Sequence, residues 1–218
     1  MTPPKRPSAI RLLLVEDYEV VRQGTRKLLD EQPDLLVVGE AADAPQAVEL
    51  AERLQPDLVL LDLRLGEGGS GFVAARHIQR LVPRVAFLVL TGLDDPEYAR
   101  VALEIGIRGY LRKSAGIAEI VAAIHRVHAG ERVLDDQIAI ALAGSRRPAP
   151  PVALDHLTDR ERAVFRLLGR GDSNAEMAAK LDISVRTAET HVANLLQKLR
   201  LRSRAAAISL AARQVAKR

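Results

Sequence analysis

The sequence contains no cysteine, and no part of it is apolar for long enough to span a membrane. The missing cysteines exclude disulfide bonds and thiolate metal sites. A membrane helix needs roughly 18 consecutive apolar residues, and no run approaches that length. The first ten residues carry Lys5 and Arg6 but lack the apolar segment of a signal peptide. We therefore expect a cytoplasmic protein that makes no contact with a membrane.

Charge is distributed unevenly along the 218 residues. Residues 1–145 contain 17 Lys and Arg against 21 Asp and Glu, a net charge of −4, whereas residues 146–218 contain 15 against 7, a net charge of +8. An acidic segment followed by a compact basic one is typical of a chain in which only the second part meets a polyanion. An arginine-rich surface alone would give the same counts, so charge does not decide between the two interpretations.

A proline-rich segment divides the chain into two parts. Residues 144–151 contain Pro148, Pro150 and Pro151, which cannot continue a helix and predict an exposed linker. We expect a first domain at residues 8–130, a helical and proline-rich linker at residues 131–154, and a second domain at residues 155–218.

The two parts differ in their predicted secondary structure. Before the linker, five short apolar runs alternate with five helical patterns, which predicts an α/β domain with a doubly wound, five-stranded parallel sheet. The strands are expected at residues 10–15, 35–39, 58–61, 85–90 and 108–111, with helices near 19–31, 45–54, 71–81, 95–105 and 116–129. After the linker, helical patterns near 158–170, 174–181, 185–200 and 203–214 predict a small all-α domain of four helices.

Polar side chains follow the ends of four predicted strands. Glu16 and Asp17 follow the first strand, Asp62 the third, Thr91 the fourth and Lys113 the fifth. The carboxyl ends of parallel strands converge on the crevice where such sheets bind ligands. Three carboxylates at one place repel each other unless a cation joins them, and oxygen ligands favour Mg²⁺. A carboxylate beside Mg²⁺ can attack phosphorus and form an acyl phosphate. Each residue alone is explained as a helix cap, a loop acid or a solvated lysine, but their joint placement indicates a site.

These segments resemble the receiver domain of response regulators over residues 10 to about 130. The likeness rests on Leu-Leu-Val-Glu-Asp at 13–17, Asp-Leu-Val-Leu-Leu-Asp-Leu at 57–63, Val-Leu-Thr at 89–91 and Gly-Ile-Arg-Gly-Tyr-Leu-Arg-Lys at 106–113. It implies a flavodoxin-like fold in which Asp62 is the phosphoacceptor and binds Mg²⁺ together with Glu16, Asp17 and the backbone carbonyl of Arg64. It also implies that Lys113 pairs with the phosphate and that Thr91 and Tyr110 are coupled switch residues.

The loop after Asp62 departs from the family pattern. Residues 63–71 lack the usual proline and are one residue longer, so we expect a more flexible loop and an altered lifetime of the phosphorylated state. Residues Gly66 to Gly71 also match G-x-G-x-x-G, which leaves a nucleotide-binding enzyme as an alternative. Against it, the fingerprint belongs after the first strand, and Asp62 would direct negative charge at a pyrophosphate. A phosphatase with an aspartate nucleophile is a second enzymatic alternative. Such enzymes commonly have another aspartate two residues after the nucleophile, and this chain has Arg64 at that position.

The second part contains a predicted helix-turn-helix. A short helix and a turn over residues 173–184 lead into residues 185–199, where one stripe is apolar: Val185, Ala188, Val192, Leu195, Leu196 and Leu199. The second helix of such a pair enters the major groove of DNA. A helical docking bundle is the alternative on pattern alone. The segments Leu-Thr-Asp-Arg-Glu at 157–161, Leu-Asp-Ile-Ser at 181–184 and Thr-His-Val at 190–192 resemble the LuxR-type helix-turn-helix.

A receiver followed by this domain resembles the NarL/FixJ class of response regulators. The resemblance implies a DNA-binding transcription regulator and not an enzyme, and it implies that a sensor histidine kinase phosphorylates the protein. It also implies a homodimer that binds an inverted repeat of double-stranded DNA. Residues 203–214 would form the dimer surface. A phosphorylation-independent regulator of the same class is the alternative. The DNA-binding residues are expected to be Ser184, Arg186, Thr187, Glu189, Thr190, Ala193, Asn194, Lys198 and Arg202. Many relatives carry lysine where this chain has Glu189, which could accept a hydrogen bond from cytosine or weaken binding.

Overall fold

A computed structural model describes residues 9–66, 70–93, 95–144, 157–199, 201 and 203–215. Its first domain is built on a parallel sheet in the order β2-β1-β3-β4-β5-β6. The predicted fold class is confirmed, and the strand count is corrected from five to six. The strands are β1 Ile10–Val15, β2 Leu35–Ala41, β3 Leu58–Leu61, β4 Ala86–Thr91, β5 Gly109–Arg112 and β6 Val133–Leu134.

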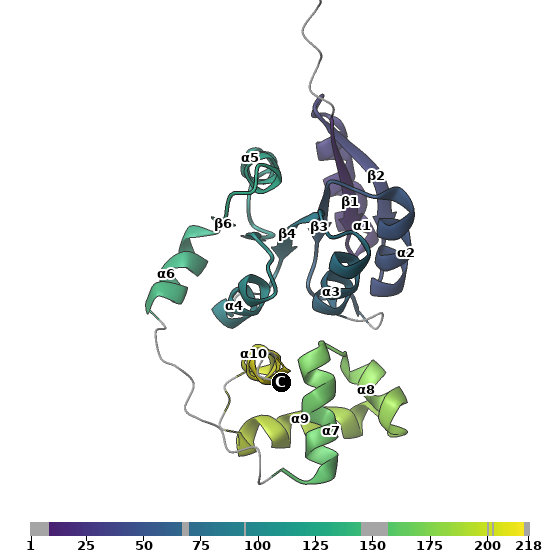
Figure 1. Ribbon diagram of the computed structural model, residues 1–218, viewed down its shortest axis with the longest axis vertical. Helices are drawn as coiled ribbons and strands as arrows, with labels where there is room; N and C mark the ends of the chain where they lie inside the picture. Colours follow the sequence, from purple (N-terminus) through teal and green to yellow (C-terminus); the bar gives the residue numbers. More distant parts are fainter. Residues whose placement is uncertain are drawn as a thin grey trace, which may run out of the picture.

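Five helices cover the two faces of this sheet (Figure 1). They are α1 Glu19–Asp30, α2 Ala44–Leu54, α3 Gly71–Leu81, α4 Pro96–Glu104 and α5 Ile117–His128. Alternate strand residues point to opposite faces. In β3, Val59 and Leu61 pack in the cluster with α2, α3 and α4, whereas Leu58 and Leu60 pack in the cluster with α1 and α5. The all-apolar sequence of β3 therefore reflects burial on both sides.

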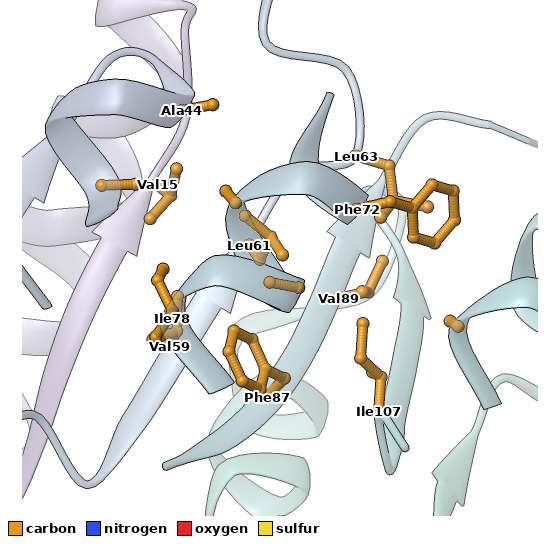
Figure 2. Packing of buried hydrophobic residues seen from close by; sticks show 14 of the residues in the cluster. Val15, Ala44, Val59, Leu61, Leu63, Phe72, Ile78, Phe87, Val89 and Ile107 are labelled. Carbon is orange, nitrogen blue, oxygen red and sulfur yellow. The ribbon is translucent and has the colours of Figure 1, made fainter. Parts of the chain in front are cut away.

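The core beneath α2 and α3 holds β3 in place. Figure 2 shows side chains from β1, β3 and β4 meeting those of α3, with Ile78 next to Val59 and Phe72 next to Leu63. All four of these residues are less than 5% exposed. This packing fixes the carboxyl end of β3, where Asp62 follows Leu61, because densely packed interiors leave little room for side chains to move.

The sixth strand lies within the segment expected to be linker. Val133 and Leu134 pair with β5, and the next residues form α6, Asp136–Gly144. Asp135 caps α6 by accepting hydrogen bonds from the backbone of Gln137 and Ile138, and its other carboxylate oxygen is 2.9 Å from Arg112 Nε. A strand of two residues is too short to show a period-two pattern, so its sequence gave no signal. The prolines of the linker lie outside the described residues.

The second domain is all-α, as predicted. Its helices are α7 Asp159–Arg170, α8 Asn174–Leu181, α9 Val185–Lys198 and α10 Arg204–Val215. The predicted capping box of Thr158 and Glu161 is present at the start of α7, and Ser173 and Glu176 form a second one at α8. Residues from all four helices share one apolar core. Figure 1 places α10 between α7 and the first-domain helix α4, and it packs on both. Within the described ranges, no helix is long and apolar enough to cross a membrane.

Candidate functional site

Three carboxylates meet at the carboxyl edge of the sheet. Glu16 and Asp17 follow β1, and Asp62 follows the neighbouring β3. One carboxylate oxygen from each lies within 4.8 Å of the others. Glu16 and Asp62 are buried, at 4% and 5% exposure. Buried like charges this close are unfavourable unless a positive group compensates them.

Lys113, which follows β5, supplies a positive charge to this cluster. Its Nζ lies 2.6 Å from Asp62 Oδ2 and 2.6 Å from Glu16 Oε2. Burial raises the pKa of Glu16; the hydrogen bond from Lys113 opposes this and the charge of Asp62 adds to it. Burial alone would lower the pKa of Lys113, but hydrogen bonds to Asp62 and Glu16 outweigh it, so that this pKa is raised. Lys113 is thus held as an ammonium ion directed at Asp62.

The hydroxyl groups of Thr91 and Tyr110 contact one short stretch of backbone. Thr91, the last residue of β4, is fully buried, and its Oγ1 accepts a hydrogen bond of 3.4 Å from the backbone N–H of Leu93. The Tyr110 hydroxyl donates to the carbonyl of Leu93 at 3.4 Å. The backbone N–H of Lys113 donates to the Thr91 carbonyl at 2.9 Å. The two residues expected to form a coupled switch therefore share a contact at Leu93.

The loop that follows Asp62 is closed by contacts between its two ends. Arg64 and Ser70 form an antiparallel bridge, and the N–H of Gly71 donates to the Leu63 carbonyl at 3.0 Å. The N–H of Arg64 also donates to Asp62 Oδ1 at 3.2 Å. The sequence predicted a more flexible loop, but its residues 67–69 lie outside the described residues. The residues on either side of them are held by contacts with each other and with Asp62.

The glycines at the ends of this loop allow close approaches by the backbone of Asp62 and the carboxylate of Asp17. A Cβ on Gly71 would lie 2.2 Å from the carbonyl oxygen of Asp62. Gly66 has a φ of 57°, in the left-handed region, and a Cβ there would lie 3.0 Å from Asp17 Oδ2. In a dinucleotide fingerprint such close approaches are made by the pyrophosphate. Here they are made by the chain itself, which argues against the nucleotide-binding alternative.

The helix-turn-helix presents most of the expected DNA-binding residues to solvent. Asp182 turns the chain with a left-handed φ of 53°, and Ser184 caps α9 by accepting a hydrogen bond of 3.0 Å from the N–H of Thr187. Within α9, Ala188 and Val192 are buried against the domain core. The exposed residues are Ser184, Arg186, Thr187, Glu189, Thr190, Ala193, Asn194 and Lys198. Arg202 lies outside the described residues.

Two features of this face differ from expectation. Val185, predicted to belong to the buried stripe, is 46% exposed, because the first residue of α9 extends beyond the core. Lys198, expected to be available to DNA phosphate, has its Nζ 2.6 Å from Glu161 Oε2. That contact, with the N-cap hydrogen bonds of Thr158, lowers the pKa of Glu161 to about 2. Lys198 therefore already has an anionic partner within its own domain.

Comparison with known families decides the class of the protein. Residues 12–125 match the response regulator receiver domain, and residues 155–211 match the luxR family of bacterial regulatory proteins. The chain is a NarL/FixJ-class response regulator. It is accordingly a DNA-binding transcription regulator and not an enzyme, and the nucleotide-binding alternative is not favoured.

Individual relatives of this response regulator cover both domains. It is 38% identical to the transcriptional regulatory protein LiaR of Bacillus subtilis, over 87% of this chain and 90% of LiaR. The crystal structure of response regulator ChrA, from a heme-sensing two-component system, is 32% identical, has a TM-score of 0.53 and is matched over 96% of this chain and 99% of ChrA. A LuxR-family response regulator from an Aurantimonas species is 39% identical, with a TM-score of 0.60, over 64% of this chain and 99% of that one.

Sequence reasoning missed the residues that join the two domains. Arg76 of α3 donates a hydrogen bond of 2.9 Å to the carbonyl of Gly169 in α7. Ile208 of α10 packs in the core cluster of the first domain. Neither residue belongs to a motif, and helical periodicity does not reveal which domain covers a given face.

Proposed function

We propose that Asp62 accepts a phosphoryl group from a sensor histidine kinase, in the cytoplasm, and thereby controls DNA binding by the second domain. The observation that carries the proposal is the Lys113 ammonium group 2.6 Å from Asp62, beside Glu16 and Asp17. In the transfer, a carboxylate oxygen of Asp62 forms a bond to phosphorus as the bond from phosphorus to the kinase imidazole nitrogen breaks. Lys113 then pairs with the charge of the new acyl phosphate. This contact favours phosphorylation control over a phosphorylation-independent regulator.

The donor set at this site fits Mg²⁺. It consists of carboxylate oxygens that lie within 4.8 Å of one another, and hard cations prefer such ligands. Glu16, Asp17 and Asp62 would hold the ion, with the backbone carbonyl of Arg64 as a further ligand. When bound, Mg²⁺ offsets negative charge on the phosphoryl oxygens. The chain's own contribution is to direct Lys113 at Asp62.

The phosphoryl group would act on the rest of the receiver through charge. The phosphoryl group carries roughly −1.5 to −2 charge in place of the single negative charge of the Asp62 carboxylate, and this larger charge draws Lys113 away from Glu16. Thr91 can donate its hydroxyl to a phosphoryl oxygen, which releases its contact with Leu93. Tyr110 shares that contact, so that a change at Thr91 is passed to its ring. The paired hydrogen bonds at Leu93 support this assignment.

The second domain would read DNA through α9. Ser184, Arg186, Thr187, Lys198 and Arg202 are assigned to phosphates, and the exposed Glu189 and Thr190 to base edges, with Ala193 and Asn194 on the same face. A homodimer with two such helices binds an inverted repeat whose half-sites lie about one helical turn apart. Selection of bound DNA from a random pool, with and without a phosphodonor, tests this assignment. Recovery of direct repeats or of single sites alone would contradict it.

The phosphorylation proposal is tested by labelling with an acyl-phosphate donor and Mg²⁺. The wild-type chain should be labelled, and Asp62→Asn should not, because the amide is not a nucleophile. The double variant Glu16→Gln, Asp17→Asn should also lose labelling, through loss of the metal. Asp34→Asn, at the opposite end of the sheet, is the matched control and should be labelled normally. Labelling of Asp62→Asn to the wild-type level would refute the assignment.

A further inference from the structure

A cavity of about 230 Å³ lies between the two domains. The first domain lines it with both ends of the loop after β3 and with the starts of α3 and α4, and the second domain with the turn between α7 and α8 and with α10. None of the three clustered carboxylates belongs to its described lining. Arg64 and Gly66 are exposed, so the cavity opens to solvent beside the loop. A small molecule can therefore enter it while both domains stay folded.

Apolar and aromatic side chains form much of the lining. Phe72 and Tyr98 lie nearly parallel, with ring centroids 6.3 Å apart and 9° between the ring planes. Phe72 is 2% exposed, and Ile208, which reaches the cavity from α10, is 3% exposed. The other apolar side chains are Leu63 and Leu93. Such walls bind the hydrocarbon part of a ligand, because the contact removes apolar surface from water.

The charged side chains of the described lining are two arginines, Arg64 and Arg204. Arg204 donates to Asn174 Oδ1 at 2.8 Å and to the carbonyl oxygen of Asp172, both of which are neutral acceptors. The Asp172 carboxylate instead lies 2.8 Å from Lys180 Nζ. Neither arginine has an ion pair within the described part of the chain. Both positive charges are therefore available to an anion in the cavity.

The two guanidinium groups act on the same phenol. Burial raises the pKa of Tyr98, and the charge of Arg204 is the largest effect that opposes it. Asp95 raises this pKa further, and Arg64 lowers it. Burial also lowers the pKa of Arg204, by more than nearby negative groups raise it. Because electrostatic effects weaken with distance, an anion beside the Tyr98 hydroxyl would be close to both cations.

The remaining polar side chains of the lining have hydrogens left to donate. The hydroxyl oxygens of Ser70 and Ser173 each accept a backbone N–H, at 3.3 and 3.2 Å, and neither hydroxyl donates within the described part of the chain. Asn174 Oδ1 accepts from Arg204, which leaves the amide hydrogens. The Tyr98 hydroxyl makes no hydrogen bond to any described residue. An ionised carboxylate, which only accepts hydrogen bonds, is complementary to such a set of donors.

We infer that this cavity is a binding site for a small organic acid, whose carboxylate lies between Arg64, Arg204 and the Tyr98 hydroxyl and whose apolar part lies against Phe72 and Ile208. Guanidinium groups pair with carboxylates through strong, charge-assisted hydrogen bonds. The volume is below the roughly 300 Å³ at which sites for drug-sized molecules begin. It corresponds to about eight water molecules, which is enough for one ring and one carboxylate. Binding there needs no chemistry at Asp62, so the acid is a second input to the protein.

The test measures binding of benzoate to the full chain by calorimetry, without Mg²⁺ or a phosphodonor. Benzoate should bind one to one, with a Kd on the order of 0.1 to 1 mM. Benzamide has the same shape without the charge and should bind on the order of 10-fold more weakly. Inorganic phosphate has charge without an apolar part and should also bind more weakly than benzoate. Equal affinity for benzamide would remove the role of charge, equal affinity for phosphate would indicate a site for a bare anion, and either result would overturn the inference.

Two variants test whether benzoate occupies this cavity. Arg64→Gln changes an exposed side chain and Tyr98→Phe keeps the ring, so both should fold. Each should weaken benzoate binding on the order of 5- to 10-fold. Matched controls outside the described lining are the exposed Arg80→Gln in α3 and the 70% exposed Tyr18→Phe, which should bind like the wild type.

Urea unfolding gives an independent measurement on the same proteins. Benzoate should raise the unfolding midpoint of the wild type, and at the same concentration it should raise that of Arg64→Gln less, because a ligand stabilises the folded chain in proportion to its occupancy. The midpoints without benzoate show whether each variant is folded. Wild-type affinity in both cavity variants, or an equal loss of affinity in the control variants, would place benzoate elsewhere and overturn the inference.

Discussion

The contact between Glu161 and Lys198 gives a prediction for the salt dependence of DNA binding. Glu161 Oε2 lies 2.6 Å from Lys198 Nζ, and its pKa of about 2 keeps it ionised at neutral pH. Under the proposed assignment of Lys198 to a DNA phosphate, that phosphate must displace this carboxylate or share the lysine with it. Glu161→Gln removes the charge and keeps the capping box of α7, because glutamine serves at that position as well as glutamate.

The expected magnitude follows from counterion release. Each neutralised phosphate contributes a slope of about −0.9 to the dependence of log affinity on log salt concentration. If Glu161→Gln frees one full cation, the slope steepens by about 0.9. Between 50 and 200 mM salt, the affinity of the variant should then fall about 3.5-fold further than that of the wild type. At the lower salt concentration, the variant should bind every DNA sequence more tightly.

The assay is a binding titration against a selected site and a scrambled site at several salt concentrations. Glu176→Gln is the matched control, because Glu176 occupies the same capping position in α8 and has no ion pair within the described part of the chain. Equal slopes for the wild type and Glu161→Gln would show that removing the carboxylate does not increase the number of phosphate charges that the protein neutralises. An equal increase in Glu176→Gln would assign the effect to net charge, and either result would refute the specific role of Glu161.

Further predictions concern stability and base recognition. The pKa of Glu161 in the folded state is below its ordinary 4.5, so its contribution to stability is present above pH 4.5 and is lost as the pH falls toward 2. In urea unfolding over that pH range, the wild type should therefore lose more stability than Glu161→Gln. Gly71→Ala should cost about 1–3 kcal/mol, because its Cβ would overlap the Asp62 carbonyl. Gly24→Ala in α1, where nothing lies within 4 Å, should instead gain about 1 kcal/mol; if both variants unfolded at the same urea concentration, the steric argument would be wrong. Glu189→Ala should change which base is preferred at one position of the DNA site, as measured by binding titrations against selected and scrambled DNA. An equal gain in affinity for every sequence would show that Glu189 does not contact a base.

The site in the first domain was predictable because each part of it has a local signal. A buried strand shows itself as an apolar run, and the residue that follows it falls at a known edge of the sheet. That rule placed Asp62 and Lys113 at the same edge of the sheet, although 51 residues separate them, and in the structure the two side chains lie 2.6 Å apart. The sequence could not show that Lys113 also contacts Glu16, because side-chain orientation depends on packing.

The contact between the domains was not predictable for a different reason. Ile208 follows the helical period of α10 like the residues beside it, and only docking decides which domain buries it. Arg76 is an arginine on a helix in an arginine-rich chain, so its pairing with Gly169 leaves no local trace. Val185 shows that periodicity has the same limit within one domain. Its position in the helical period predicted a buried residue, but the core of the domain does not extend to the first residue of α9.

The pair formed by Arg112 and Asp135 has a mechanical consequence. Asp135 caps α6, and the segment that joins the two domains starts where α6 ends. Arg112 is adjacent in sequence to Lys113. A pulling force on the second domain, carried along the chain to α6, would act on β5 through this ion pair together with the pairing of β6 and the packing of Ile138, one residue from the lysine that faces Asp62. Tension on the second domain would thus reach the strand that immediately precedes Lys113, the proposed partner of the phosphate.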